Sequence, residues 1–299
     1  VVGCPRSGTT LLQRMLDNHP QLTVANDTHF ITRAAKRVLR KDPVPRLAPG
    51  LVEAVKSYRR FHRMGLAEAE VSRAAEGCET YAEFVGRLYS IRGQKKQKPL
   101  SGEKTPDYCR SMPVLHGLFP LARFIHIIRD GRDTALSTLN WAMESKGPGT
   151  WSLWTTDPVG TCALWWRWQA GIGHRDGPIL GESRFYQVRY EDLVDEPEKE
   201  LRVIAGFLDI PYSDSMANYH EGKTRNQPGL SAKSAWLPPV KNLRDWRKDM
   251  APEDIGVFEG IAGPLLREIG YNTGGQPTTA RVKERVNDCL SWWQSEGKA

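Results

Sequence analysis

The first twenty residues constrain the fold of this chain more than any other stretch. The β-branched pair Val1-Val2 leads into a loop bounded by Gly3 and Gly8, and apolar side chains then recur at helical spacing until Pro20. This pattern predicts a strand, a tight loop and a helix in succession. A glycine-bounded loop that enters a helix directs backbone N–H groups and the positive end of the helix dipole at one point. We therefore expect an anion, most simply a phosphate, to bind there.

The loop differs from the one that binds nucleoside triphosphates. The GxxxxGK[ST] motif has a lysine after its second glycine, whereas here Thr9 takes that position and the cation of the loop is Arg6. A strand-to-helix turn without a ligand would need neither the arginine nor the hydroxyl groups. The candidate phosphate-binding residues are Pro5, Arg6, Ser7, Gly8, Thr9 and Thr10.

Length and charge indicate an α/β protein with a small anionic ligand. The 299 residues alternate strand and helix patterns, which favours a single domain. Lys and Arg (42) exceed Asp and Glu (35), but the basic residues are scattered, so we expect no nucleic-acid partner. The predicted fold is a P-loop-like central parallel sheet flanked by helices. We expect residues 1–271 to form one domain with a helical insert over about 30–95, and residues 272–299 to form a linker and a C-terminal helix.

Cysteine usage argues against a disulfide framework and against a metal site. The five cysteines are an odd number, with no CxxC pair and no spacing suited to zinc. This favours a reducing, cytoplasmic compartment. No apolar stretch approaches the roughly twenty residues that a membrane helix needs. The sequence begins without Met and inside a predicted strand, so we expect residues before Val1. Whether these include a signal or an anchor is not decided by the sequence.

Candidate general bases follow a predicted second strand at Gln21–Val24. Ligands of open α/β sheets bind at the carboxyl ends of the strands, so the loop of residues 25–29 should lie near the phosphate loop. Asp27 and His29 stand in this loop as candidate bases. The alternatives are that Asp27 caps the next helix and that His29 is simply packed.

Two further predicted strands each end at a basic side chain. A short strand that begins near Pro99 ends at Lys104, and the apolar run Phe124–Ile128 ends at Arg129. A guanidinium forms forked, charge-assisted bonds to phosphate, and the Ser137 hydroxyl follows eight residues later in a predicted helix. The alternative for Arg129 is a structural ion pair, and for Lys104 it is an exposed side chain after a strand.

Two other regions bear on ligands. Between 222 and 250 the chain is basic, and Lys233 and Lys241 are equally good candidates for a phosphate contact. Six tryptophans lie between Trp141 and Trp168. They would suit an aromatic, lipid or sugar-like acceptor, although core packing is the simpler interpretation.

Four segments carry a resemblance to a known family. Cys4–Thr10 resembles the 5′-phosphosulfate loop of the sulfotransferases that use 3′-phosphoadenosine 5′-phosphosulfate (PAPS). Met15–Pro20 and Glu103–Pro106 are similar to segments of the branch that includes tyrosylprotein and many bacterial sulfotransferases. Arg129 and Ser137 match, with the same spacing, the pair that binds the 3′-phosphate in this family.

The resemblance implies a PAPS-dependent enzyme with 3′,5′-ADP as its product and no metal. It places a catalytic carboxylate at Asp27, where the tyrosylprotein branch has Glu, and it brings Arg6 and Lys104 to the sulfonate. Loop residues 5–10 would hold the 5′-phosphate. The resemblance does not identify the acceptor, whose hydroxyl or amine could belong to an aromatic, lipid, sugar or polyketide compound.

Two other functions compete with this interpretation. A P-loop kinase or nucleotide hydrolase shares the strand-loop-helix start and would bind ATP with Mg²⁺. Such an enzyme needs a lysine in the loop, and this chain has Thr9 in that position. A non-catalytic module of the same fold would bind the nucleotide without transferring anything from it.

Overall fold

The computed structural model describes residues 1–142, 146–221, 238, 244–274 and 279–297. The chain divides into two compact units. The first, which we call the sheet unit, comprises Val1–Gly3, Gly8–Ile127 and Gly173–Val240. The second, the helical unit, comprises Cys4–Ser7, Ile128–Ile172 and Lys241–Ala299. Among the described residues, none of the helices combines the length and apolar character that a bilayer crossing requires.

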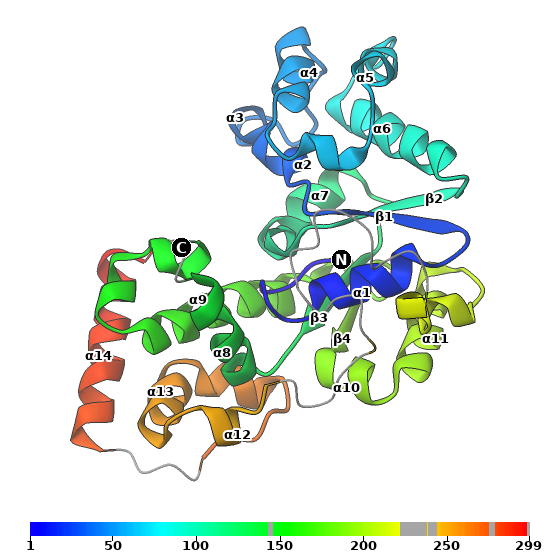
Figure 1. The fold of residues 1–299 in the computed structure, drawn as a ribbon. Helices are drawn as coiled ribbons and strands as arrows, with labels where there is room; N and C mark the ends of the chain where they lie inside the picture. The colour runs from blue at the N-terminus through cyan, green and yellow to red at the C-terminus, as the bar shows by residue number, and fades with distance from the viewer. Residues whose placement is uncertain (143–145, 222–237, 239–243, 275–278, 298–299) are drawn as a thin grey trace. The chain divides into compact units, whose positions relative to one another are not determined.

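The strands are short and lie in two pairs (Figure 1). They are β1 (Leu22–Asn26), β2 (Leu100–Lys104), β3 (Phe124–Ile128) and β4 (Phe185–Arg189). β1 pairs with β2 in parallel, with Asn26 opposite Lys104, and β3 is the neighbour of β4. The prediction of an α/β fold with parallel strands is therefore confirmed, although most of the described chain is helical.

The predicted first strand is reduced to a single bridge. Val2 pairs in parallel with His126 of β3, and its N–H and C=O bond to β3 at 2.9 and 3.0 Å. On its other side, the C=O of Val1 and the N–H of Gly3 bond to the residues just after β2, each at 3.2 Å. Residues 1–3 thus connect the two strand pairs within the sheet unit and lead directly into the phosphate loop.

Helix α1 (Thr9–Asp17) covers one face of these strands. Its apolar residues Leu12, Met15 and Leu16 are buried in a cluster that also holds Ile125 and Ile127 of β3. The predicted helix is confirmed, and it begins earlier than the apolar periodicity alone indicates. The helices α10 (Tyr190–Asp195) and α11 (Pro197–Leu208) and the 3₁₀ turns η6 (Asp214–Met216) and η7 (Tyr219–Glu221) complete this side of the unit.

Short helices of the predicted insert form a second core in the sheet unit. The elements are α2 (Phe30–Arg33), α3 (Lys36–Leu39), α4 (Pro49–Lys56), η1 (Phe61–Met64), α5 (Glu68–Ala75) and α6 (Tyr81–Lys95), followed later by η2 (Pro106–Ser111), α7 (Met112–Leu118) and η5 (Pro178–Leu180). Helix α6 begins with a capping box, in which Thr80 accepts the N–H of Glu83 and Glu83 accepts that of Thr80. The apolar positions that predicted helices here, such as Val55 and Phe84, are buried.

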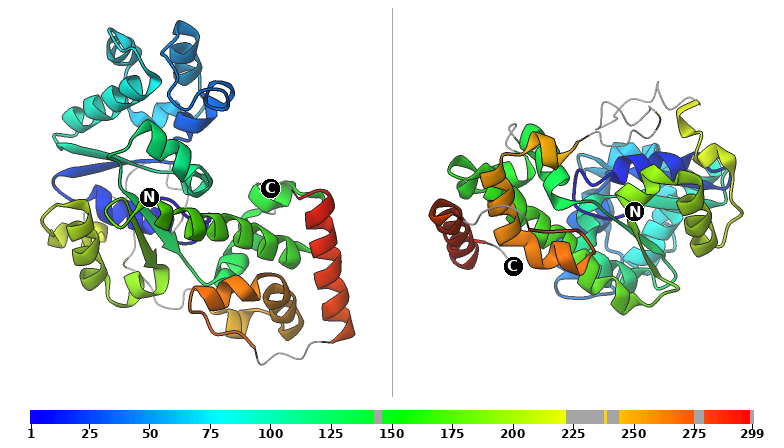
Figure 2. Two further views of the ribbon diagram at one scale, coloured as in Figure 1. Left: turned by 180° about the vertical axis from the view of Figure 1, so that it is seen from behind. Right: turned by 90° about the horizontal axis from the view of Figure 1, so that it is seen from below.

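The helical unit packs around tryptophans. Its elements are α8 (Gly131–Ala142), η3 (Gly147–Thr150), η4 (Ser152–Thr155), α9 (Pro158–Asp176), α12 (Trp246–Asp249), α13 (Pro252–Glu268) and α14 (Ala280–Ser295), of which α9 ends in the sheet unit. Trp151 contacts the rings of Trp165, Trp168, Trp292 and Trp293 at centroid distances of 5.2–6.0 Å. These contacts agree with core packing, and they hold the C-terminal helix α14 within the unit (Figure 2).

The sequence Asp195-Glu196-Pro197-Glu198 predicts a helix start capped by Asp195, and the basic run of residues 93–98 predicts a solvated loop. Both predictions are wrong. Asp195 does not cap the helix that follows it, because α11 begins at Pro197 with Glu196 at its N-cap and no side-chain cap bond. The basic run of residues 93–98 is only partly a loop, because α6 continues to Lys95. Lys98 is also not fully solvated: its ammonium group donates to the C=O groups of Asp17 and Leu22.

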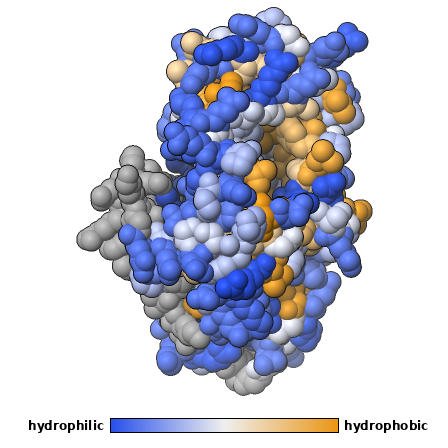
Figure 3. Space-filling model, turned by 90° about the vertical axis from the view of Figure 1, so that its right-hand side faces the viewer, coloured by the Kyte–Doolittle hydropathy of each residue, from blue (hydrophilic) through white to orange (hydrophobic). Residues whose placement is uncertain are grey.

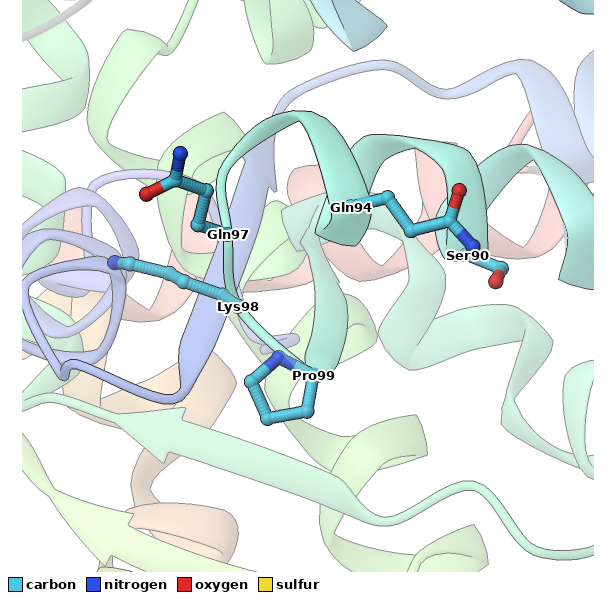
Figure 4. A pocket seen from close by; sticks show the side chains of 5 residues that line it. All are labelled: Ser90, Gln94, Gln97, Lys98 and Pro99. Atoms are coloured by element: carbon cyan, nitrogen blue, oxygen red, sulfur yellow. The ribbon is translucent and has the colours of Figure 1, made fainter.

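The surface next to Lys98 is a shallow hollow of about 360 Å³. Figure 4 shows its lining, which is Ser90, Gln94, Gln97, Lys98 and Pro99. The Lys98 ammonium is already used by two backbone carbonyls, so the hollow has little chemistry to offer a ligand. On the face drawn in Figure 3, hydrophilic residues predominate and hydrophobic ones form a narrow seam.

A buried histidine in the sheet unit, His126, predicts acid sensitivity. His126 is fully buried, and its Nδ1 and that of His174 both lie 3.0–3.1 Å from Oε1 of Gln187. Burial lowers the pKa of His126 to about 4. The neutral ring is therefore favoured in the folded state, so its stabilising contribution is complete above pH 6.5 and is lost as the pH falls towards 4. The free energy of unfolding should decrease by up to about 3 kcal/mol over this range.

Denaturant unfolding at several pH values tests this expectation. His126→Asn keeps a donor for Gln187 but does not titrate, so it should flatten this part of the pH dependence. His62→Asn, at an exposed histidine, serves as the control and should leave the dependence as in the parent. Identical pH profiles for the parent and His126→Asn would contradict the assignment.

Candidate active site

The phosphate loop has the backbone conformation that an anion cradle needs. Arg6 and Gly8 have positive φ angles of 77° and 90°, and Gly8 is the N-cap of α1. The first N–H groups of a helix have no acceptor within that helix, so those of α1 point out of its N-terminal end towards the loop. Ser7 is fully buried, yet its hydroxyl has no hydrogen-bond partner among the described residues. A buried unpaired hydroxyl in such a loop fits a ligand with oxygen acceptors.

Glycine is required at position 8 for a steric reason as well. A Cβ atom there would lie 2.3 Å from Cδ2 of Tyr190. Tyr190 starts α10 directly after β4. The tyrosine ring thus packs on the backbone of the loop, and any side chain at Gly8 would displace one of them.

Asp27, Lys104 and Thr10 form a continuous polar contact in the sheet unit. The Lys104 ammonium lies 3.0 Å from Oδ1 of Asp27 and donates to Oγ1 of Thr10 at 3.3 Å. The parallel register explains this, because Lys104 ends β2 opposite Asn26 and Asp27 is the next residue. The prediction that these strand ends lie together near the start of α1 agrees with this geometry. The alternative that Asp27 caps a helix is wrong, because α2 has His29 at its N-cap and no side-chain cap bond.

Lys104 is not an exposed lysine after a strand. Only 1% of it is accessible to solvent. Burial lowers its pKa, and the carboxylate of Asp27 is the largest influence in the opposite direction. The ammonium therefore sits in a poorly solvated place, where it interacts strongly with any negative charge that approaches it.

His29, the second candidate base, faces a different carboxylate. Its Nδ1 lies 3.8 Å from Oδ2 of Asp107, which also binds Arg33 at 2.8 Å. Burial lowers the pKa of His29 to about 4, so the ring is neutral near pH 7. Asp27, and not His29, contacts Lys104.

A second group of candidate residues lies in the helical unit. Nε of Arg6 donates to Oγ of Ser137 at 3.1 Å. Arg129 is buried at the end of β3, where its C=O accepts the indole N–H of Trp166 and its guanidinium lies 4.0 Å from Asp133. Burial, and then the charges of Arg244 and Arg129, lower the pKa of Arg6. Arg6, which contacts Ser137, is therefore also influenced by the positive charges of Arg244 and Arg129, and a group of cations of this kind suits a dianionic phosphate.

Arg132 has a structural role. Its buried guanidinium binds Asp130 at 2.7 Å and Glu259 at 2.6 Å, and it stacks 3.6 Å from the ring of Trp246. The sequence places two possible carboxylate partners beside it, Asp130 and Asp133, and the structure pairs it with Asp130. The N–H of Trp246 in turn donates to Asp133, so this network fastens the start of α12 to α8.

Sequence reasoning missed three residues near these groups. Arg63 donates to the C=O groups of Asn26 and Asp27 at 3.4 and 3.3 Å and lies 3.8 Å from the Asp27 carboxylate. Glu103 accepts hydrogen bonds around the same loop. Arg244 acts on Arg6 through its charge. Glu103 belongs to the recognised segment Glu103–Pro106 but was given no role there, and no pattern in the helical insert singles out Arg63.

Some candidates have no described position. Lys233 and Lys241 both lie outside the described residues, so their predicted phosphate contacts stay predictions. Within the part of the chain that is described, no three His, Cys, Asp or Glu side chains come together in a way that would hold a metal ion. All five cysteines have free thiols.

The fold and these groups define an α/β protein in which residues 1–3, a glycine-bounded loop and helix α1 follow one another. The profile of the sulfotransferase family matches residues 1–214. The chain therefore belongs to the sulfotransferase family and is an enzyme of that family.

Curated relatives and solved structures agree with this membership. The chain is 27% identical to protein-tyrosine sulfotransferase A of Caenorhabditis elegans over 92% of its length and 67% of the relative. It is 26% identical to the Drosophila melanogaster protein-tyrosine sulfotransferase, over 92% of this chain but only 52% of that protein. Its fold is similar to the sulfotransferase domain of the Synechococcus PCC 7002 olefin synthase, with a TM-score of 0.60, 22% identity and coverage of 91% and 94% of the two chains.

Proposed function

We propose that this enzyme moves a sulfuryl group from PAPS to an acceptor hydroxyl or amine by in-line displacement. The observation that carries the proposal is the contact series Asp27–Lys104–Thr10, which joins a carboxylate, a buried ammonium and the first turn of the phosphate-loop helix. Sulfuryl transfer needs a group that removes the acceptor proton and cations that neutralise the charge on the transferring group. This series supplies both.

The loop residues 5–10 are assigned to the 5′-phosphate end of the donor. The buried, unpaired hydroxyl of Ser7 and the N–H groups at the start of α1 are suited to its oxygens. Arg6, within the loop, neutralises negative charge on the sulfonate or on the departing phosphate. Fixed cations of this kind provide the charge stabilisation that Mg²⁺ provides in phosphoryl transfer.

Arg129 and Ser137 are assigned to the 3′-phosphate. The guanidinium is buried, which strengthens its bonds to a phosphate, and the Ser137 hydroxyl already accepts from Arg6 and can donate to another oxygen. Lys233 and Lys241 stay candidates for a further phosphate contact.

Asp27 is assigned as the base that takes the proton of the acceptor. Lys104 lies 3.0 Å from Oδ1 of its carboxylate, and Arg63 lies 3.8 Å from Oδ2, so two cations fix the orientation of the proposed base. The acceptor class is not assigned. The relatives named above are called protein-tyrosine sulfotransferases, so a phenolic hydroxyl is the first class to test, followed by lipid, sugar and polyketide hydroxyls and by amines.

Nucleotide titration tests the donor assignment without an acceptor. We expect 3′,5′-ADP to bind at least about tenfold more tightly than AMP in the presence of EDTA, because only the former has a 3′-phosphate for Arg129. Tighter binding of ATP with Mg²⁺ than of 3′,5′-ADP would support the kinase or hydrolase alternative and would contradict the proposal.

A further inference from the structure

The loop that carries Asp27 has a strained backbone. Asp27 and His29 have φ angles of 54° and 58°, in the left-handed region that non-glycine residues seldom adopt. Such a conformation persists only where surrounding groups hold it. The position of the Asp27 carboxylate therefore depends on the contacts that fix residues 27–29.

The end of β2 supplies these contacts, one for each residue of the loop. The N–H of Asp27 donates to the C=O of Lys104 at 2.6 Å, and the N–H of Thr28 donates to Oε1 of Glu103 at 3.0 Å. The N–H of His29 lies 3.4 Å from Oγ1 of Thr105. Of the three acceptors, Glu103 provides the one that is a charged side chain.

The Glu103 carboxylate is itself held from two further directions. Oε2 accepts from the Tyr89 hydroxyl of α6 at 2.8 Å, and Oε1 accepts from the Thr105 hydroxyl. Burial raises the pKa of Glu103, and the bonds from Thr105, Thr28 and Tyr89 oppose this shift. Three donors aimed at one carboxylate leave it little freedom to move. It is thus a rigid link between α6, the end of β2 and the loop of Asp27.

We propose that Glu103 is a positioning residue, which fixes the Asp27 carboxylate against Lys104 through its bond to the N–H of Thr28. This inference rests on the proposed function, because it concerns the base of that reaction. Glu103 need not touch either substrate. Its role depends on the length of its side chain, because the hydrogen bonds to Thr28 and Tyr89 both require that length.

Two conservative variants separate the effect of the length of the Glu103 side chain from the effect of its charge. Glu103→Gln keeps the length and an oxygen for the Thr28 N–H, and its amide can donate to Tyr89. Glu103→Asp keeps the charge but is shorter by one methylene. We expect Glu103→Gln to lower kcat for sulfuryl transfer by less than about 10-fold and Glu103→Asp to lower it by about 100-fold, with KM for PAPS within about threefold in both. If only the charge of Glu103 mattered, Glu103→Gln would lower kcat more than Glu103→Asp.

A double-mutant cycle shows whether the effect acts through Asp27. In the Asp27→Asn background, Glu103→Asp should change the remaining rate by less than about threefold, because the base that it positions is gone. Transfer is followed from labelled PAPS to the best acceptor of a mixed panel and also to water. Glu83→Asp is the control, because Glu83 also accepts two backbone N–H groups, at 2.8 and 3.2 Å, but at the start of α6.

The outcomes are distinct. Loss of kcat in Glu103→Asp but not in Glu83→Asp, with the effect absent in the Asp27→Asn background, supports the inference. Equal rates for the parent and Glu103→Asp, or a full loss of about 100-fold repeated in the Asp27→Asn background, overturns it while the proposed function stands. A parent enzyme that transfers to neither acceptor nor water overturns the proposed function and this inference with it.

Discussion

Replacing Lys104 with methionine is expected to lower kcat for sulfuryl transfer by about 100- to 1,000-fold. The side chain is nearly the same length, so the change removes the charge and little of the packing. The buried ammonium of Lys104 contacts both Asp27 and Thr10, and a fixed donor of this kind that stabilises charge in a transition state contributes about this much. Binding of 3′,5′-ADP should change little, because the product lacks the sulfonate that Lys104 is proposed to meet. The measurement is transfer from labelled PAPS beside a titration with 3′,5′-ADP.

Lys98→Met is the matched control for this variant. Lys98 precedes the same strand and binds backbone carbonyls instead of the candidate active site. Its replacement is expected to reduce stability but to leave kcat within a few-fold of the parent. If Lys104→Met and Lys98→Met lower kcat equally, Lys104 has no special role in the reaction.

The second large effect is expected in nucleotide recognition by Arg129. Arg129→Ala should weaken binding of 3′,5′-ADP by about 100-fold, or about 2.7 kcal/mol, because the buried guanidinium is the assigned partner of the 3′-phosphate. Binding of AMP, which lacks this phosphate, should change by less than about threefold. The ratio of the two dissociation constants is therefore the quantity to measure.

Arg123 provides the control for this variant, because it precedes β3 whereas Arg129 follows it. Arg123→Ala should leave both affinities close to those of the parent. Equal weakening of 3′,5′-ADP and AMP in Arg129→Ala would mean that the residue supports the fold or the adenosine, and would contradict its assignment to the 3′-phosphate.

Part of the fold could be predicted because β1 and β3 are short and buried. The run Phe124–Ile128 has five apolar or packed residues, and the strand occupies that range. The glycine-bounded loop also predicted the start of α1, which begins at Thr9 directly after Gly8. The first strand was predicted less well. Two β-branched residues indicate an extended backbone, but they do not determine how many residues pair with a neighbouring strand. The Asp195 cap failed because a short helix, α10, already occupies the residues before it.

The candidate site could be predicted where its residues follow strands. Asp27 and Lys104 each lie at the end of a strand, and the parallel register brings them to 3.0 Å. Arg63 could not be found in this way, because it reaches Asp27 from a 3₁₀ turn whose position depends on packing across the helical insert. Glu103 was recognised as part of a motif, but its bond to the N–H of Thr28 depends on the left-handed backbone of the loop, which no local pattern indicates.

The most direct test of the central claim is transfer of the labelled sulfuryl group from PAPS by the parent enzyme and by Asp27→Asn, in EDTA, with an acceptor panel led by phenols. We expect equal amounts of sulfonated acceptor and 3′,5′-ADP from the parent. For Asp27→Asn we expect a loss of at least about 100-fold in kcat, with binding of 3′,5′-ADP retained. Transfer by Asp27→Asn at the rate of the parent would contradict the assigned base. Binding of 3′,5′-ADP by the parent with no transfer to any acceptor or to water would contradict the proposed reaction.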